Sequence, residues 1–196
     1  AIGIHPEDVD GVTQDDIKFI EDNLGNEKIV AIGEIGLDYY YTKDNKEEQI
    51  KLFETQLALA EKYNLPVIVH SRDATEDTIN SLKKFNCKGV IHSFSGSLET
   101  ARIYIKMGYL LGVNGVITFK NAKIKEVIKE VGLENIILET DSPYLTPEPF
   151  RGKQNNPGHV LEVAKFVANL YDISLEELAI QTNKNVIEMY KKMKLD

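Results

Sequence analysis

Several side chains that can bind a metal ion follow short apolar runs of this sequence. The four side chains are Glu34, His70, His92 and Asp141, and the apolar runs lie at 28–33, 65–69, 89–91 and 135–138. Burying this many ionisable groups together is costly unless a cation compensates their charge. Mixed histidine and carboxylate ligands suit Zn²⁺ or Mn²⁺, and they tolerate Mg²⁺ if water completes its coordination. A metal site of this kind activates water for hydrolysis.

The elements that must position these residues are strands alternating with helices. The apolar runs are nearly continuous in Ile, Val and Leu, as is typical of strands buried on both faces of a parallel sheet. Six strands are predicted, at 1–4, 28–33, 65–69, 89–91, 109–113 and 135–138. Helical patterns lie between them, and four residues are predicted to begin helices, namely Asn45, Asp73, Ser97 and Ser174. This alternation predicts βαβ units.

The number of strands predicts an incomplete barrel. A closed barrel of eight βα units takes roughly 250 residues, whereas this chain has 196 and about six visible strands. The first apolar run starts at residue 1 without a methionine, as if a strand were entered partway. We therefore expect a single α/β domain over 1–196, a TIM-type barrel truncated at its N-terminus to about six of eight units. In such a barrel the strand ends converge on one face, which would bring the ligand-type residues into one pocket.

An open, doubly wound sheet of six strands is the alternative architecture. It is disfavoured because no glycine-rich phosphate-binding turn follows the first strand. His159 follows no strand, and we expect it in or just before a helix. The one long irregular stretch, 142–157, is rich in Pro, Gly and Asn, and loops of this length are often functional.

Composition excludes several classes of protein. The chain is 42% hydrophobic and 28% charged, which is ordinary for a soluble globular protein and excludes wholesale disorder. Its net charge of −8 argues against coating duplex DNA through a basic face, although a metal-lined pocket can still grip a few phosphates. No apolar run approaches the ~18 residues of a membrane span. A single cysteine, Cys87, forbids an internal disulfide and predicts the cytoplasm.

Six blocks of this sequence resemble the TatD-type metal-dependent deoxyribonucleases, which are amidohydrolase-like barrels. The matching blocks are GIHP at 3–6, AIGEIGLDY at 31–39, LPVIVHSR at 65–72, HSFSG at 92–96, ETDSPYLTP at 139–147 and RGKQN at 151–155. Their order, spacing and length make the resemblance specific, and it runs from end to end. The chain departs from the family in two respects. It has no His-x-His pair of the kind found on the family's first strand, and Gln154 follows Lys153 where the family's loop usually carries Arg.

The resemblance implies roles for individual residues. Glu34 matches a metal-bridging glutamate, while His70 and His92 match two single histidine ligands. Asp141 matches a metal-binding aspartate that also orients or deprotonates the attacking water, so Glu34 and Asp141 are the expected catalytic residues. Asp38 is expected either to support a metal ligand or to hold its loop in place, and the second role is favoured. Five residues fall on the substrate side, where arginine suits phosphate, and these are His5, Arg72, Arg151, Lys153 and Asn155.

These inferences predict a divalent-metal-dependent hydrolase of phosphodiester bonds in DNA, with metal-activated water attacking phosphorus. One or two Mg, Mn or Zn ions per chain are expected, with single-stranded DNA or DNA ends as substrate. A related hydrolase of small esters or amides is one alternative, because fold does not fix function. A non-catalytic fragment that binds or self-associates through open barrel edges is another.

Overall fold

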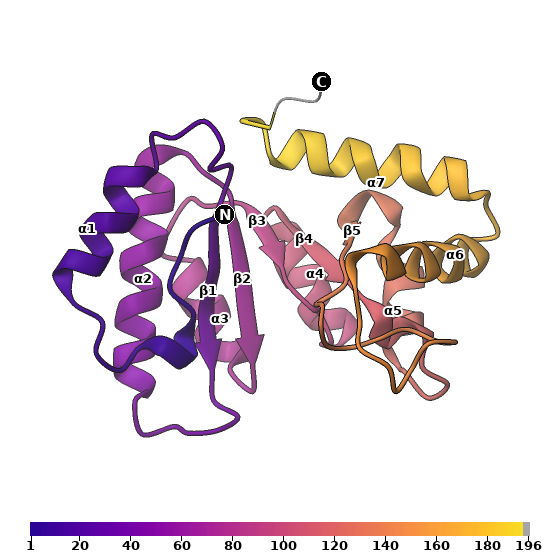
Figure 1. Cartoon of the computed structure of the whole chain (residues 1–196), viewed down its shortest axis with the longest axis horizontal. Helices are drawn as coiled ribbons and strands as arrows, with labels where there is room; N and C mark the ends of the chain where they lie inside the picture. Colours follow the sequence, from indigo (N-terminus) through magenta and orange to yellow (C-terminus); the bar gives the residue numbers. More distant parts are fainter. Residues whose placement is uncertain (194–196) are drawn as a thin grey trace. The chain divides into compact units, whose positions relative to one another are not determined.

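A computed structural model describes residues 1–193 of the chain. Its backbone contacts divide the described residues into two compact units, one comprising 1–91 with 189–193, and the other comprising 92–188. Each unit combines parallel strands with helices (Figure 1). The expectation of one domain over 1–196 stays a prediction.

The first unit is built on three parallel strands in the order β1 (Ile32–Asp38), β2 (Val67–Arg72) and β3 (Gly89–Ile91). Its helices are η1 (Pro6–Asp8), α1 (Gln14–Asn23), α2 (Lys46–Tyr63) and α3 (Thr75–Leu82). Helix α2 packs against β1, and α3 packs against β1 and β2. Five apolar strand side chains of this unit are fully buried, namely Ile32, Ile35, Leu37, Val67 and Val69, and their burial makes a large stabilising contribution.

The second unit contains two parallel strands, β4 (Tyr109–Val113) and β5 (Ile136–Leu138). Its α-helices are α4 (Leu98–Lys106), α5 (Ile124–Val131), α6 (Val160–Tyr171) and α7 (Leu175–Met189). Three short 3₁₀ helices join them, namely η2 (Gly115–Thr118), η3 (Leu133–Asn135) and η4 (Pro157–His159). His159 closes η4 and directly precedes α6, which confirms its predicted place before a helix.

The predicted strands are confirmed in part. Strands β3 and β4 have the predicted bounds, and β5 starts one residue later than predicted. The bounds predicted for β1 and β2 were wrong, because Glu34 and His70 lie inside these strands and not behind them. Both strands continue past the end of the apolar run. A polar side chain does not interrupt a strand, because the backbone hydrogen bonds to the neighbouring strand are still formed.

The strand predicted at 1–4 is reduced to a single bridge between Ile2 and Ile32. Beyond this bridge, the backbone of Ile4 pairs with the side chain of Gln56. Its Oε1 accepts a hydrogen bond of 2.7 Å from the backbone N–H of Ile4, and its Nε2 donates one of 3.0 Å to the carbonyl of the same residue. The backbone groups of Ile4 are therefore satisfied by a helix side chain in place of a strand ladder.

Two of the four predicted helix starts carry the predicted caps. Ser97 accepts a hydrogen bond from the backbone of Thr100, and Ser174 forms a reciprocal capping box with Glu177. The other two caps were wrong. Asn45 precedes α2 without capping it, because its Oδ1 accepts from the Gln49 side chain. Asp73 lies in a left-handed turn outside α3.

Helix α1 was not predicted, although it has its own start signal. Thr13 and Asp16 form a capping box at its N-terminus. Within residues 1–193, no helix has both the length and the apolarity needed to cross a bilayer. The compartment stays a prediction.

Candidate metal centre

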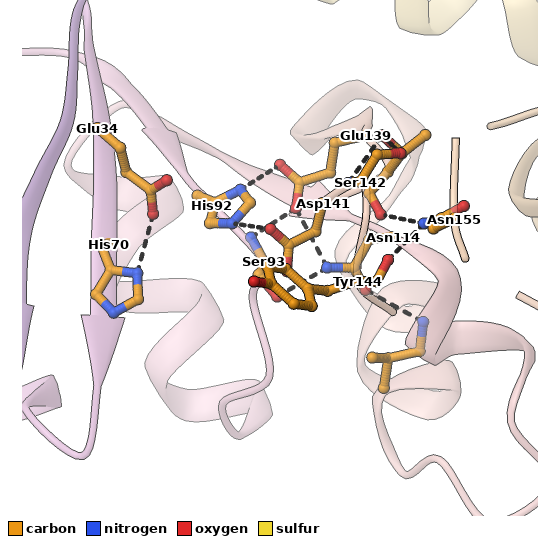
Figure 2. A network of polar contacts seen from close by, with 12 residues as sticks. Glu34, His70, His92, Ser93, Asn114, Glu139, Asp141, Ser142, Tyr144 and Asn155 are labelled. Carbon is orange, nitrogen blue, oxygen red and sulfur yellow. Dashed lines mark hydrogen bonds and ion pairs between the residues drawn. The ribbon is translucent and has the colours of Figure 1, made fainter. Parts of the chain in front are cut away.

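Three residues of the first unit form a cluster with the chemistry of a metal site. His5, Glu34 and His70 each offer one ligand atom, and these atoms all lie within 4.8 Å of one another. Nδ1 of His70 lies 2.9 Å from Oε1 of Glu34 (Figure 2). Two imidazoles and one carboxylate form a donor set that suits Zn²⁺ or Mn²⁺. The residues present therefore fit the divalent cation that the sequence predicts.

His5 joins this cluster from the start of η1, where it is the N-cap residue. Its ring meets the ring of His70 edge-on, with 4.5 Å between the centroids. Burial lowers the pKa of His5, and the neighbouring His70 lowers it further, against a weaker opposing effect of Glu34. The neutral imidazole, which is the form that binds metals, is therefore favoured at neutral pH. Sequence reasoning placed His5 on the substrate side and missed its closeness to two ligand-type residues.

His70 is held between two carboxylates. Its Nε2 lies 2.8 Å from Oδ2 of Asp38, which is only 4% exposed, and its Nδ1 faces Glu34. Burial lowers the pKa of His70, but the hydrogen bonds with Glu34 and Asp38 together outweigh burial and raise it. A carboxylate behind a histidine fixes the ring orientation and presents the other nitrogen for metal binding. Asp38 also does what the sequence predicted, because its Oδ1 accepts a hydrogen bond from the backbone of Tyr40 and holds that loop.

A second cluster lies in the second unit and contains His92, Glu139 and Asp141 (Figure 2). Nδ1 of His92 lies 2.8 Å from Oε2 of Glu139, and its Nε2 lies 3.4 Å from Oδ1 of Asp141. The other oxygen of Glu139 accepts a hydrogen bond of 2.7 Å from the backbone N–H of Ser93. Asn114 supports this arrangement by donating to the Ser93 hydroxyl at 2.7 Å.

Glu139 directly follows the strand predicted at 135–138, and the sequence placed it with Asp141 at the end of that strand but assigned it no role at the site. The signal that could have indicated it is its spacing of two from Asp141 directly behind a strand, since residues two apart in extended backbone face the same side. Asp141 itself has a φ of 55°, a sparsely populated conformation for a residue other than glycine. Such backbone is found at functional sites.

The structure thus brings together two pairs of the predicted ligands. Glu34 lies with His70 in the first unit, and His92 lies with Asp141 in the second. The expectation that all four share one pocket stays a prediction.

The predicted substrate-side residues differ in their surroundings. The guanidinium of Arg72 lies 3.6 Å from the ring centroid of Tyr40, and that of Arg151 lies 4.2 Å from the ring centroid of Phe119. Lys153 is exposed, with its Nζ 5.8 Å from the ring centroid of Phe150. These three cations are accessible from solvent, and their role in substrate binding stays a prediction.

Asn155 is buried, and its side chain is used within the protein. Its Nδ2 donates to the carbonyls of Thr140 at 2.8 Å and Tyr144 at 2.6 Å. Its Oδ1 accepts from the backbone of Asn156. These bonds favour a structural role, in which Asn155 fastens the long loop to the segment carrying Asp141. Its predicted contact with substrate stays a prediction.

Comparison with known proteins identifies the family. The family described as "TatD related DNase" matches residues 1–191. The chain belongs to the TatD family. It is 45% identical to the "Uncharacterized metal-dependent hydrolase YabD" of Bacillus subtilis over 195 residues, which cover 97% of this chain and 76% of YabD. It is 38% identical to YcfH of Escherichia coli, which carries the same description, over 97% of this chain and 72% of YcfH.

Solved structures of TatD proteins share the fold. YjjV of E. coli, described as a TatD homologue, superposes with a TM-score of 0.89 at 33% identity, covering 97% of this chain and 76% of YjjV. A TatD family hydrolase from Entamoeba histolytica superposes with a TM-score of 0.84 at 27% identity, covering 98% and 74%. The TIM-barrel-like α/β fold is therefore confirmed over the open doubly wound sheet. The predicted lack of two N-terminal units is not confirmed by these matches and stays a prediction.

Membership of the TatD family makes this chain part of a family of metal-dependent hydrolases. The descriptions of YabD and YcfH name no substrate.

Proposed function

We propose that this protein is a divalent-metal-dependent hydrolase of phosphodiester bonds in DNA. The observation that carries the proposal is the cluster of His5, Glu34 and His70, with Arg72 two residues beyond His70 on the same strand. Residues two apart on a strand face the same side, so this strand presents a metal-ligand residue and a cation together. A site that joins metal ligands to a guanidinium suits a phosphodiester, because the guanidinium pairs with phosphate oxygens in a fork geometry.

When bound, a divalent cation supplies Lewis-acid polarisation of a phosphoryl oxygen and lowers the pKa of water. In this chain His5, Glu34 and His70 would hold a cation in the first unit, and His92 with Asp141 offers further donors in the second. Asp38 contacts Nε2 of His70, and Glu139 contacts Nδ1 of His92, so each carboxylate holds the orientation of one histidine ring. The carboxylate of Asp141 is proposed to orient the attacking water and accept its proton.

The substrate side of the proposal rests on exposed cations. Arg72 in the first unit and Arg151 and Lys153 in the second are exposed and available to bind phosphate, and each supplies local positive charge in a chain whose net charge is −8. Single-stranded DNA or DNA ends are the proposed substrate. We expect binding to weaken as salt rises, because phosphate contacts release counterions.

The test is nucleotide release from an end-labelled single-stranded oligonucleotide after reconstitution with Mg²⁺, Mn²⁺ or Zn²⁺. EDTA should abolish release, and Glu34→Ala should lower it by at least ~10²-fold, in line with loss of a group that acts on the reacting centre. Glu48→Ala is the matched control, since this exposed carboxylate on α2 lies outside both clusters. Undiminished activity in chelator would overturn the proposal. Turnover of a small ester in place of DNA would favour the alternative hydrolase.

A further inference from the structure

Two exposed tyrosines and an arginine form a layered group in the first unit. Tyr40 is 55% exposed and Tyr41 is 74% exposed, and their rings meet edge-on with 4.8 Å between the centroids. The guanidinium of Arg72 lies 3.6 Å from the centroid of Tyr40 and 5.7 Å from that of Tyr41. Tyr40, Tyr41 and Arg72 together form an aromatic platform. Large aromatic rings left in water lose the free energy that burial would provide, so their exposure side by side indicates a binding surface.

The aromatic platform is connected to the candidate metal centre through one carboxylate. Oδ1 of Asp38 accepts a hydrogen bond of 2.8 Å from the backbone N–H of Tyr40, and Oδ2 of the same residue lies 2.8 Å from Nε2 of His70. The strand register adds a second connection, because Asp38 pairs with Arg72 across β1 and β2. The platform therefore begins where the strands that carry Glu34 and His70 end.

We propose that the aromatic platform stacks one unpaired nucleobase of a DNA strand beside the cluster of His5, Glu34 and His70. The inference rests on the proposed function and adds to it a site that recognises the base. Aromatic rings and guanidinium planes stack on any base, and the charge of Arg72 also attracts the adjoining phosphate. In a duplex both faces of a base are covered by its neighbours, so the platform selects unpaired bases.

The net charge of −8 strengthens this argument. A chain with this charge has little long-range attraction for DNA, so short-range contacts at the site must supply the affinity. Stacking on Tyr41, the more exposed ring, is such a contact, and it is insensitive to salt.

The test compares binding of two oligonucleotides to the metal-reconstituted protein by fluorescence anisotropy. One is a short oligothymidylate and the other is an abasic strand of equal length, and both carry phosphorothioate linkages that resist hydrolysis. We expect the wild-type protein to prefer the strand with bases by roughly 5- to 100-fold. Tyr40→Ala and Tyr41→Ala should each reduce this preference toward equality. Tyr41→Ala leaves the contact of Arg72 with Tyr40 in place and should not change affinity for the abasic strand. Tyr41→Phe should keep the preference, since the ring remains.

Tyr63→Ala is the matched control. Tyr63 is also exposed, at 38%, and also lies beside a cation, with Nζ of Lys62 5.3 Å from its ring centroid. It differs from the platform in its position, since it lies at the C-terminal end of α2, before β2 begins, whereas the platform lies where β2 ends. If both alanine variants still prefer the strand with bases and still cleave an ordinary oligonucleotide, the role of the platform in base stacking is wrong and the proposed function is unaffected. Failure of the wild-type protein to bind or cleave either strand would overturn both.

Discussion

Glu139 and His92 are joined by a contact of 2.8 Å between Oε2 and Nδ1. The second oxygen of Glu139 accepts from the backbone N–H of Ser93 at 2.7 Å. One carboxylate thus accepts from two donors when His92 carries its proton on Nδ1. This tautomer leaves Nε2 of His92, on the side of Asp141, free of a proton and able to bind a cation.

Glu139→Gln is expected to disturb this arrangement without changing the size of the side chain. His92 Nδ1 and the N–H of Ser93 face different oxygens of Glu139, and the amide puts an NH₂ donor in place of one of these two acceptors. We expect roughly 10- to 100-fold weaker binding of Zn²⁺ or Mn²⁺. Glu134→Gln, at an exposed position, should leave affinity unchanged. Nitrogen NMR of the His92 ring in metal-free protein should show loss of the Nδ1–H tautomer in the variant, and its retention would contradict this account.

The metal content of the first unit should depend on His70. We expect His70→Ala to remove the ion held with His5 and Glu34, because two remaining ligands bind a divalent cation weakly. His159→Ala is the matched histidine control, since the ring of His159 stacks on Phe150 with 4.7 Å between centroids and lies outside both clusters. Elemental analysis after reconstitution gives the stoichiometry. Equal metal content in wild type and His70→Ala would rule out this cluster as a metal site.

Gly36→Ala should destabilise the first unit. Gly36 has a φ of 148°, and a Cβ placed there would lie 2.0 Å from the carbonyl oxygen of His70 on the paired strand. Relief of this overlap requires β1 and β2 to separate, so we expect a loss of about 2–4 kcal/mol in the free energy of unfolding. Denaturant unfolding measures it. Gly25→Ala, where no atom lies within 4 Å and φ is ordinary, should change stability by no more than about 0.5 kcal/mol.

Cys87 should resist alkylation in the folded protein. Burial of the thiol, aided by the negative charge of Glu61, raises its pKa to about 11. Because the unfolded chain loses this proton at lower pH than the folded chain, the contribution of the neutral thiol to stability is present below about pH 8.5 and falls as pH rises toward 11. Iodoacetamide at pH 8 should label denatured protein rapidly and native protein at least ~10-fold more slowly. Equal rates would show that Cys87 is accessible.

The sequence by itself predicted most residues of the candidate site. The types of Glu34, His70, His92 and Asp141, each close to an apolar run, predicted metal ligands, and the structure pairs them as Glu34 with His70 and His92 with Asp141. Strands β3 and β4 were also predicted with their bounds, because a continuous apolar run between polar turns has a local signature. Capping by Ser97 and Ser174 followed from short-range hydrogen bonding, which sequence spacing determines.

Tertiary structure decided what depends on distant partners. The strand predicted at 1–4 is not formed beyond one bridge at Ile2. The backbone of Ile4 instead forms hydrogen bonds with the side chain of Gln56, which is 52 residues away in the sequence. The contact of His5 with His70 likewise depends on how η1 meets β2, and no local pattern encodes it. The positioning of His92 by Glu139 joins residues 47 apart. Side-chain identity and spacing thus determined which residues could bind a metal. Which of these residues contact one another depends on how distant segments pack, because a hydrogen bond between residues far apart in the sequence requires the fold to bring them together.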